Sequence, residues 1–193
     1  MSGGDLRCGM IDAIRFDLDR FEPRDDAERG HLARMRQLLA DAGERATRRD
    51  HFEPGHFTAS AFVLSPAGDR VLLIHHAKLK RWLQPGGHID ATDTSPIDAA
   101  RRELLEEAGV AETAALGGLF DVDVHPIPPN PKRGEPAHEH FDLRYLLKAG
   151  SDGISAASDA LAARWATIEE LSSVEDASVA RAAAKLAVAA GRS

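Results

Sequence analysis

The chain has 193 residues, of which 43% are hydrophobic and 28% are charged, a balance that is ordinary for a globular protein with one buried core. The formal net charge of −7 argues against a general nucleic-acid binder, because such proteins neutralise phosphates with a basic surface. The single cysteine, Cys8, excludes an internal disulfide and a cysteine-rich zinc cluster.

The sequence also lacks the features of a membrane protein. No stretch approaches the roughly 18 consecutive apolar residues of a membrane span, and residues 1–7 lack the apolar core of a signal peptide. We therefore expect a cytoplasmic protein that does not bind membranes.

Residues 1–50 predict a largely helical segment. Leu32, Met35, Leu38 and Leu39 lie at helical spacing in a background of arginine, aspartate and glutamate. We interpret this segment as an N-terminal helical appendage that packs on a main domain of residues 51–193.

The pattern changes to strands near His56. Apolar residues fill 57–64 and 71–74, and the turn Ser65-Pro-Ala-Gly-Asp69 between them favours a β-hairpin. Residues 82–88 contain a proline and two glycines and predict a loop that a ligand or another segment could approach closely.

The next element is a helix with unusually consistent boundary signals. Ser95 is the predicted N-cap, Pro96 occupies the first helical position, Asp98 lies three residues after the cap, and Gly109 ends the helix.

The remaining chain predicts strands and helices around one long proline- and glycine-rich loop. In chain order these are a strand at 116–124, the loop at 126–136, a strand at 140–147, a strand at 163–166, a helical turn at 168–171 and a closing helix at 177–190.

Three carboxylates lie together on the capped helix. At about 100° of rotation per residue, Glu103, Glu106 and Glu107 fall within one arc of the helix surface, near the C-terminal end where the helix dipole disfavours anions. A solvated acidic face is the simple reading of such a triplet. A bound Mg²⁺ or Mn²⁺, which prefer oxygen ligands, would remove both sources of repulsion and would point to phosphate chemistry.

The segment from Arg102 to Val110, Arg-Glu-Leu-Leu-Glu-Glu-Ala-Gly-Val, matches the second half of the Nudix signature, R-E-U-x-E-E-x-G-U, where U is aliphatic. The chain therefore resembles the Nudix hydrolase family, over residues 57–171. In the first half of the signature Asp93 replaces the usual glutamate, and eight residues instead of seven separate it from Arg102.

The resemblance implies a fold, an activity and a metal site. The fold would be an α/β sandwich in which helices flank a mixed β-sheet, and the activity would be Mg²⁺-dependent hydrolysis of a diphosphate bond in a nucleotide-like substrate. Glu103, Glu106, Glu107 and the carbonyl of Gly87 would bind the metal. Arg102, four residues before Glu106, would form an ion pair that orients a carboxylate.

The general base that accepts a proton from the attacking water stays open at this point. Family members place it either in the signature or on a loop outside it, so Glu103, Glu135 and Glu139 are all candidates.

Several aromatic side chains are candidate substrate contacts. His88 directly follows Gly87 and is the first choice, and Trp82 could stack on a base, although an aromatic beside an apolar run is more often core. His138 and His140 share one face of a predicted strand, where either ligand contact or ordinary packing would fit. The spacing of the histidines matches no zinc pattern.

The resemblance also suggests a substrate and two competing functions. Pro126 lies sixteen residues after Val110, as a proline does in members acting on ADP-ribose, so an ADP-ribose-like substrate is one hypothesis. A prenyl diphosphate isomerase would need a catalytic cysteine, which Cys8 does not supply. A regulator that binds a nucleotide without hydrolysing it is the alternative from another class, and a homodimer is expected by analogy.

Overall fold

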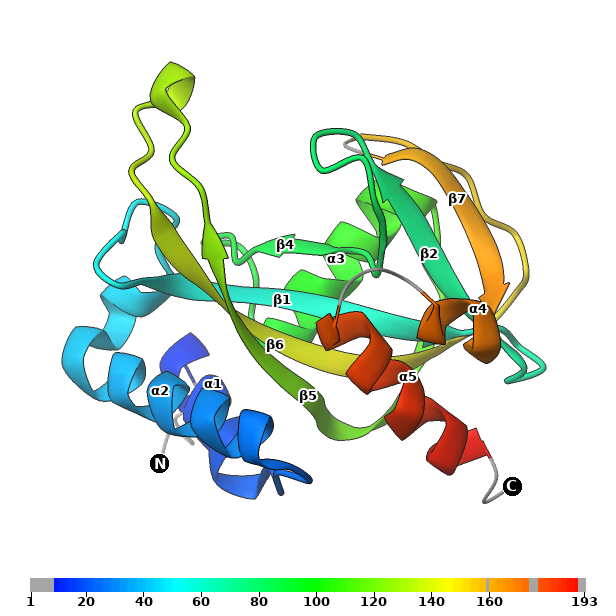
Figure 1. Ribbon diagram of the computed structural model, residues 1–193, viewed down its shortest axis with the longest axis horizontal. Helices are drawn as coiled ribbons and strands as arrows, with labels where there is room; N and C mark the ends of the chain where they lie inside the picture. The colour runs from blue at the N-terminus through cyan, green and yellow to red at the C-terminus, as the bar shows by residue number, and fades with distance from the viewer. Residues whose placement is uncertain (1–8, 159, 174–176, 191–193) are drawn as a thin grey trace, which may run out of the picture.

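The computed structural model describes residues 9–158, 160–173 and 177–190, and Figure 1 shows the arrangement of its elements. Cys8 lies outside the described residues. The helices and 3₁₀ turns are α1 (Met10–Arg20), α2 (Asp26–Ala42), η1 (Gly43–Thr47), α3 (Pro96–Ala108), η2 (Pro131–Arg133), α4 (Ile168–Ser172) and α5 (Ala177–Ala190). The strands are β1 (Gly55–Leu64), β2 (Arg70–His76), β3 (Trp82–Leu83), β4 (Gly86–His88), β5 (Thr113–Ile127), β6 (His138–Ala149) and β7 (Ala160–Thr167).

The seven strands form one mixed sheet. Its main order is β3-β2-β1-β6-β5, with β4 paired to β1 and β7 paired to β2. Strands β1 and β6 run parallel over their full common length, from the pair Gly55 and Glu139 to the pair Leu64 and Lys148. The other pairings are antiparallel.

Two hydrophobic cores lie on opposite faces of this sheet, because successive side chains of a strand alternate between its faces. In the first core, Phe57 and Phe141 of the sheet pack with Met35 of α2 and Leu104 of α3. The second core lies between the sheet and helices α4 and α5 and contains Phe62. The expected sandwich of helices around a mixed sheet is therefore confirmed.

The N-terminal helices belong to the first core. Ile14 and Leu18 of α1, together with Leu32, Met35 and Leu38 of α2, are buried in it. The helical character expected for residues 1–50 is confirmed over α1 and α2. The division into an appendage and a main domain stays a prediction.

Helix α3 begins and ends at the predicted residues. The Ser95 side chain accepts a hydrogen bond from the Asp98 backbone N–H, and Pro96 lies in the first turn. Gly109 adopts φ +69°, a left-handed conformation that glycine reaches without steric cost, and its N–H donates to the Leu105 carbonyl at 3.0 Å.

The prediction of a loop over residues 82–88 is wrong in two places, because this segment contains β3 and β4. Gly86 of β4 pairs with Ser60 of β1 so closely that a Cβ on Gly86 would lie 2.3 Å from the Ser60 Cβ. The paired glycines that suggested a bend instead allow a third backbone to approach β1.

The other predicted elements are found with longer strands than the sequence suggested. Strands β5, β6 and β7 each extend beyond the apolar runs that predicted them, and α5 has the predicted bounds. Among the described helices, none combines the length and the apolar character that crossing a membrane requires.

A buried cluster of ion pairs joins β5, β6 and α5. The Arg144 guanidinium donates to Asp121 at 3.2 Å, to Asp123 at 3.1 Å and to Asp142 at 2.9 Å. Arg181 of α5 donates to Asp121 at 3.1 Å. Burial alone would raise the pKa of Asp121, but the neighbouring arginines lower it to about 2. These ion pairs link β5 and β6 to each other and to α5.

Candidate active site

The three predicted carboxylates project from α3 into different surroundings. The side chain of Glu106 is 48% exposed and that of Glu103 is 16% exposed, whereas Glu107 is buried. Glu103 and Glu107 therefore face the backbone of β4, whereas Glu106 is the one of the three that is largely open to solvent.

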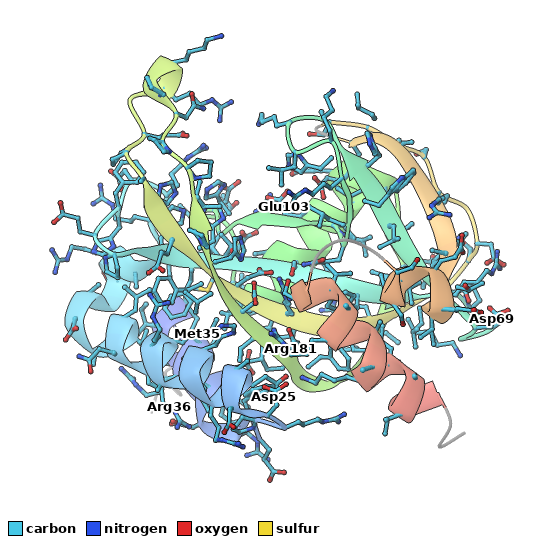
Figure 2. The ribbon with its side chains drawn as sticks, in the orientation of Figure 1. Asp25, Met35, Arg36, Asp69, Glu103 and Arg181 are labelled. Carbon is cyan, nitrogen blue, oxygen red and sulfur yellow. The ribbon has the colours of Figure 1, made fainter. Side chains whose placement is uncertain are left out.

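The glycine pair of β4 lies directly against these carboxylates. The backbone N–H of Gly86 donates to Glu107 Oε2 at 3.0 Å. A Cβ on Gly87 would lie 2.5 Å from the Glu103 carboxyl carbon, so only glycine leaves room for the carboxylate here. Figure 2 shows Glu103 near β4, away from α4 and α5.

Arg102 holds this site together through hydrogen bonds in several directions. Its guanidinium donates to both oxygens of Asp93, at 3.1 and 3.0 Å, and to Glu103 Oε1 at 2.9 Å. It also donates to the His88 carbonyl at 2.8 Å and, more weakly, to Glu106 at 3.5 Å. The carboxylates of Asp93 and Glu103 raise the pKa of Arg102, so the guanidinium stays charged.

Asp93 forms an ion pair with Arg102. The sequence departs from the Nudix signature at this residue, yet its carboxylate binds Arg102 in the two-pronged geometry that fixes a guanidinium. The extra residue between Asp93 and Arg102 falls around the start of α3, where it leaves the spacing of the helical carboxylates unchanged.

Burial raises the pKa of the Glu103 carboxyl, and the hydrogen bond from Arg102 opposes that shift. A cation beside Glu103 would therefore stabilise its ionised form. A divalent cation beside it would replace the repulsion from Glu106 with attraction.

The donor set fits a hard divalent cation. Three carboxylates and the nearby β4 backbone supply only oxygen ligands, the type that Mg²⁺ prefers. Mg²⁺ typically binds one or two protein carboxylates and keeps several waters.

Two predicted residues lie in other surroundings. Glu139 of β6 forms an ion pair with Arg34 of α2. Trp82 of β3 packs against the second core, with the Arg164 guanidinium 4.9 Å from its ring centre and His75 at its edge. Their catalytic and substrate-binding roles stay predictions.

His88 connects the acidic site with a group of histidines. Its carbonyl binds Arg102, and its ring lies 5.1 Å from that of His56 and 5.2 Å from that of His140. Burial lowers the pKa of His88 to about 4, and the neighbouring His56 adds to this shift. His56 was not singled out from the sequence, because its neighbours come from strands far apart in the chain.

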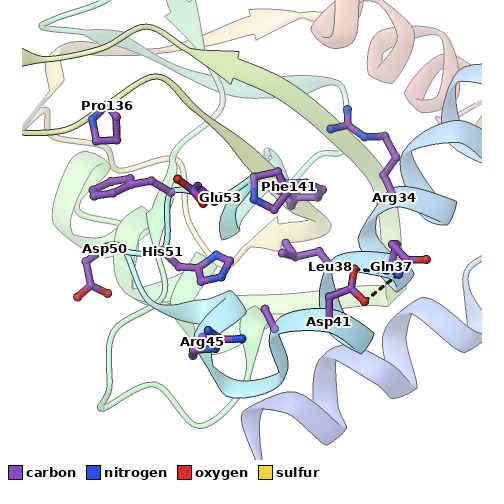
Figure 3. A pocket seen from close by; sticks show the side chains of 13 residues that line it. Arg34, Gln37, Leu38, Asp41, Arg45, Asp50, His51, Glu53, Pro136 and Phe141 are labelled. Atoms are coloured by element: carbon purple, nitrogen blue, oxygen red, sulfur yellow. Dashed lines mark hydrogen bonds between the residues drawn. The ribbon is translucent and has the colours of Figure 1, made fainter.

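A separate cavity of about 610 Å³ lies between α2, η1 and the segment before β1. Figure 3 shows Arg34, Asp41, His51 and Phe141 on its walls. Among the described residues that line it, none is a glutamate of α3. We therefore do not assign this cavity to the acidic site.

Replacement of Gly87 by alanine is expected to lower kcat/KM by about 100-fold, because displacement of a reacting group by about 1 Å can cost that much. The added Cβ must push away the Glu103 carboxylate, which is the flexible end of a side chain, so we expect the free energy of unfolding to change by less than about 1 kcal/mol. Steady-state kinetics and urea unfolding measure the two effects.

Gly118→Ala is the matched control for this prediction, since a Cβ at Gly118 meets nothing within 4 Å. It should leave both kcat/KM and stability unchanged. Equal activity losses in the two variants would mean that contact with Glu103 is not the reason Gly87 matters.

A family model described as the NUDIX domain matches residues 54–187. One similar protein is a "Probable DHNTP pyrophosphohydrolase" of Lactococcus lactis subsp. cremoris, 40% identical over 79 residues, which are 41% of this chain and 46% of that protein. Another is an "8-oxo-(d)GTP phosphatase" of Mycolicibacterium smegmatis, 40% identical over 63 residues, which are 33% of this chain and 19% of that protein. The matched segments thus span less than half of either relative.

Solved structures with a similar fold cover more of the chain. A hydrolase of the NUDIX family from Clostridium perfringens has a TM-score of 0.51 and 25% identity, covering 69% of this chain and 97% of that one. An Ap4A hydrolase of C. elegans has a TM-score of 0.54, covering 71% of this chain and 98% of that one. At 16% identity, the second likeness concerns the fold alone.

Proposed function

Since this chain belongs to the NUDIX domain family, we propose that it is a metal-dependent pyrophosphohydrolase that cleaves a diphosphate bond in a nucleotide-like substrate. The observation that carries the proposal is the close approach of the Gly86–Gly87 backbone to Glu107 and Glu103. This approach places two of the three α3 carboxylates directly against the backbone of β4, which carries the Gly87 carbonyl.

Glu103, Glu106 and Glu107, with the carbonyl of Gly87, would hold Mg²⁺, and Mn²⁺ would substitute for it. When bound, the cation neutralises the diphosphate and polarises a phosphoryl oxygen. Arg102 positions the Glu103 carboxylate through its 2.9 Å hydrogen bond and is itself fixed by Asp93.

Glu103 is the side chain we assign as the proton acceptor. In the reaction, the oxygen of water bonds to phosphorus, the bridging P–O bond breaks, and the water proton passes to a carboxylate. Glu103 is partly buried and held in place by Arg102. Glu139 instead pairs with Arg34, and Glu135 lies 4.0 Å from Arg133 beyond the ends of β5 and β6.

The test is product release from a panel of diphosphate compounds, each with Mg²⁺ and again with a chelator. ADP-ribose enters the panel because of Pro126, and dihydroneopterin triphosphate, 8-oxo-dGTP and Ap4A enter because proteins with similar sequence or fold are named for them. His88 and Trp82 are the proposed substrate contacts, and alanine variants of each are compared on the preferred compound.

Glu106→Gln is the variant that we expect to lose activity, and Glu169→Gln is its control. Glu106 is half exposed on α3, so the substitution should leave folding intact while removing one anionic ligand. Glu169 undergoes the same chemical change at an exposed position of α4. Mg²⁺-dependent turnover that only Glu106→Gln abolishes would support the proposal.

A different result would select another function. If no compound is cleaved and the folded native chain still binds one of them, the protein is a nucleotide-binding regulator and the hydrolase proposal fails. The expected homodimer stays a prediction, and light scattering on the purified chain measures it.

A further inference from the structure

Three histidines meet on the sheet face opposite to the first core. His56 of β1 is paired in register with His140 of β6, and His138 lies two residues before His140 on the same face. One ligand nitrogen from each of the three rings lies within 4.8 Å of the other two. The ring centres are 4.9 to 5.3 Å apart.

Backbone carbonyls fix the protonation of two of these rings. His56 Nδ1 lies 3.0 Å from the His51 carbonyl, and His138 Nδ1 lies 2.8 Å from the Pro136 carbonyl. A carbonyl can only accept a hydrogen bond, so Nδ1 carries the proton in each ring and Nε2 keeps its lone pair. Metal-binding histidines are commonly held in this way.

The Nε2 atom of His56 has no hydrogen-bond partner, although His56 is only 1% exposed. A buried polar atom without a partner costs roughly 1–3 kcal/mol, and native structures rarely keep one without a reason.

From this geometry we propose that His56, His138 and His140 bind a transition-metal dication of the Zn²⁺ type at a second metal site. Imidazole nitrogen suits such ions, whereas the α3 carboxylates suit Mg²⁺. Three histidines leave one position of a tetrahedral Zn²⁺ open. The ring of His125, 5.7 Å from that of His140 and held by Asp123, borders the site. This proposal does not depend on the hydrolase proposal.

The test is calorimetric titration of the chelator-treated chain with Zn²⁺, together with visible absorption of Co²⁺ as a spectroscopic substitute. We expect one tight equivalent, a Co²⁺ spectrum of low coordination number, and a rise in Tm with Zn²⁺. His138→Ala and His140→Ala should each weaken binding by about 100-fold or more, since even indirect partners of a metal contribute 10–100-fold.

Two control variants separate this site from other Zn²⁺ binding. His75→Ala removes a histidine of β2 whose ring contacts that of Trp82 on β3, and Glu106→Gln disables the carboxylate site. Both should keep the tight equivalent. The proposal fails if the native chain binds no Zn²⁺, if the histidine variants bind it as tightly as the native chain, or if only Glu106→Gln loses it. If substitution of the buried His56 prevents folding, the variants His138→Ala and His140→Ala still test the proposal.

Discussion

Replacing Glu103 by glutamine is expected to lower kcat by about 10²- to 10⁴-fold, the usual contribution of a positioned general base. The amide keeps the size of the side chain and still accepts the hydrogen bond from Arg102, but it cannot take the proton of water. Single-turnover and steady-state kinetics on the preferred substrate measure the loss.

Glu135→Gln and Glu139→Gln are the comparisons that decide the assignment. Each should change kcat by less than about tenfold, or about 1.4 kcal/mol, because their carboxylates pair with arginines outside the α3 site. If Glu135→Gln or Glu139→Gln lowers kcat by about 10²-fold or more while Glu103→Gln stays active, the general base is that residue and not Glu103.

The Mg²⁺ requirement separates the two roles of Glu103. If Glu103→Gln has a low kcat but needs no more Mg²⁺ than the native chain to reach it, the variant has lost a proton acceptor. A variant that recovers activity at high Mg²⁺ has lost a metal ligand, and its deficit is one of binding.

Arg144→Met is expected to lower the free energy of unfolding by about 3–5 kcal/mol, the cost of removing one partner from a buried ion pair. Arg144 is 2% exposed and contacts Asp121, Asp123 and Asp142. Methionine fills similar volume but leaves these carboxylates with less compensation. Urea unfolding followed by circular dichroism measures the change.

Arg29→Met provides the matched control, since the Arg29–Asp26 pair lies on the surface of α2. Exposed pairs contribute about 0–1 kcal/mol, so this variant should unfold almost as the native chain does. If Arg144→Met fails to fold, Arg181→Met removes a less buried partner of the same cluster. Native-like unfolding of both cluster variants would contradict the expected effect.

Local signals predicted α3 and its carboxylates well. A cap, a proline, a left-handed glycine and an acidic arc depend on neighbours within one or two turns, and the structure has Ser95, Pro96 and Gly109 in those places. The strands predicted from apolar runs were found, but β5, β6 and β7 extend beyond those runs at both ends.

Contacts between distant strands could not be predicted from these signals. His56 meets His140 only because β1 and β6 pair in parallel, and no local pattern specifies that register. The same pairing brings Thr58 and Ser60 to Asp142. The ion pair between Asp93 and Arg102, in contrast, could have been predicted, because the two charges are opposite and Asp93 lies shortly before the helix that carries Arg102. It was not predicted, because Asp93 departs from the family pattern.

The parallel pairing of β1 and β6 also has a consequence for how the chain folds. Thr58 and Asp142 are 84 residues apart, and α3 lies wholly within the loop that this pairing closes. Closing a long loop costs entropy before its contacts repay it, and non-local pairing slows folding. Hairpins and α3 can form early, but the central pair of strands must wait for most of the chain. A ribosome must therefore have synthesised β6 before the sheet on which α3 rests can be completed.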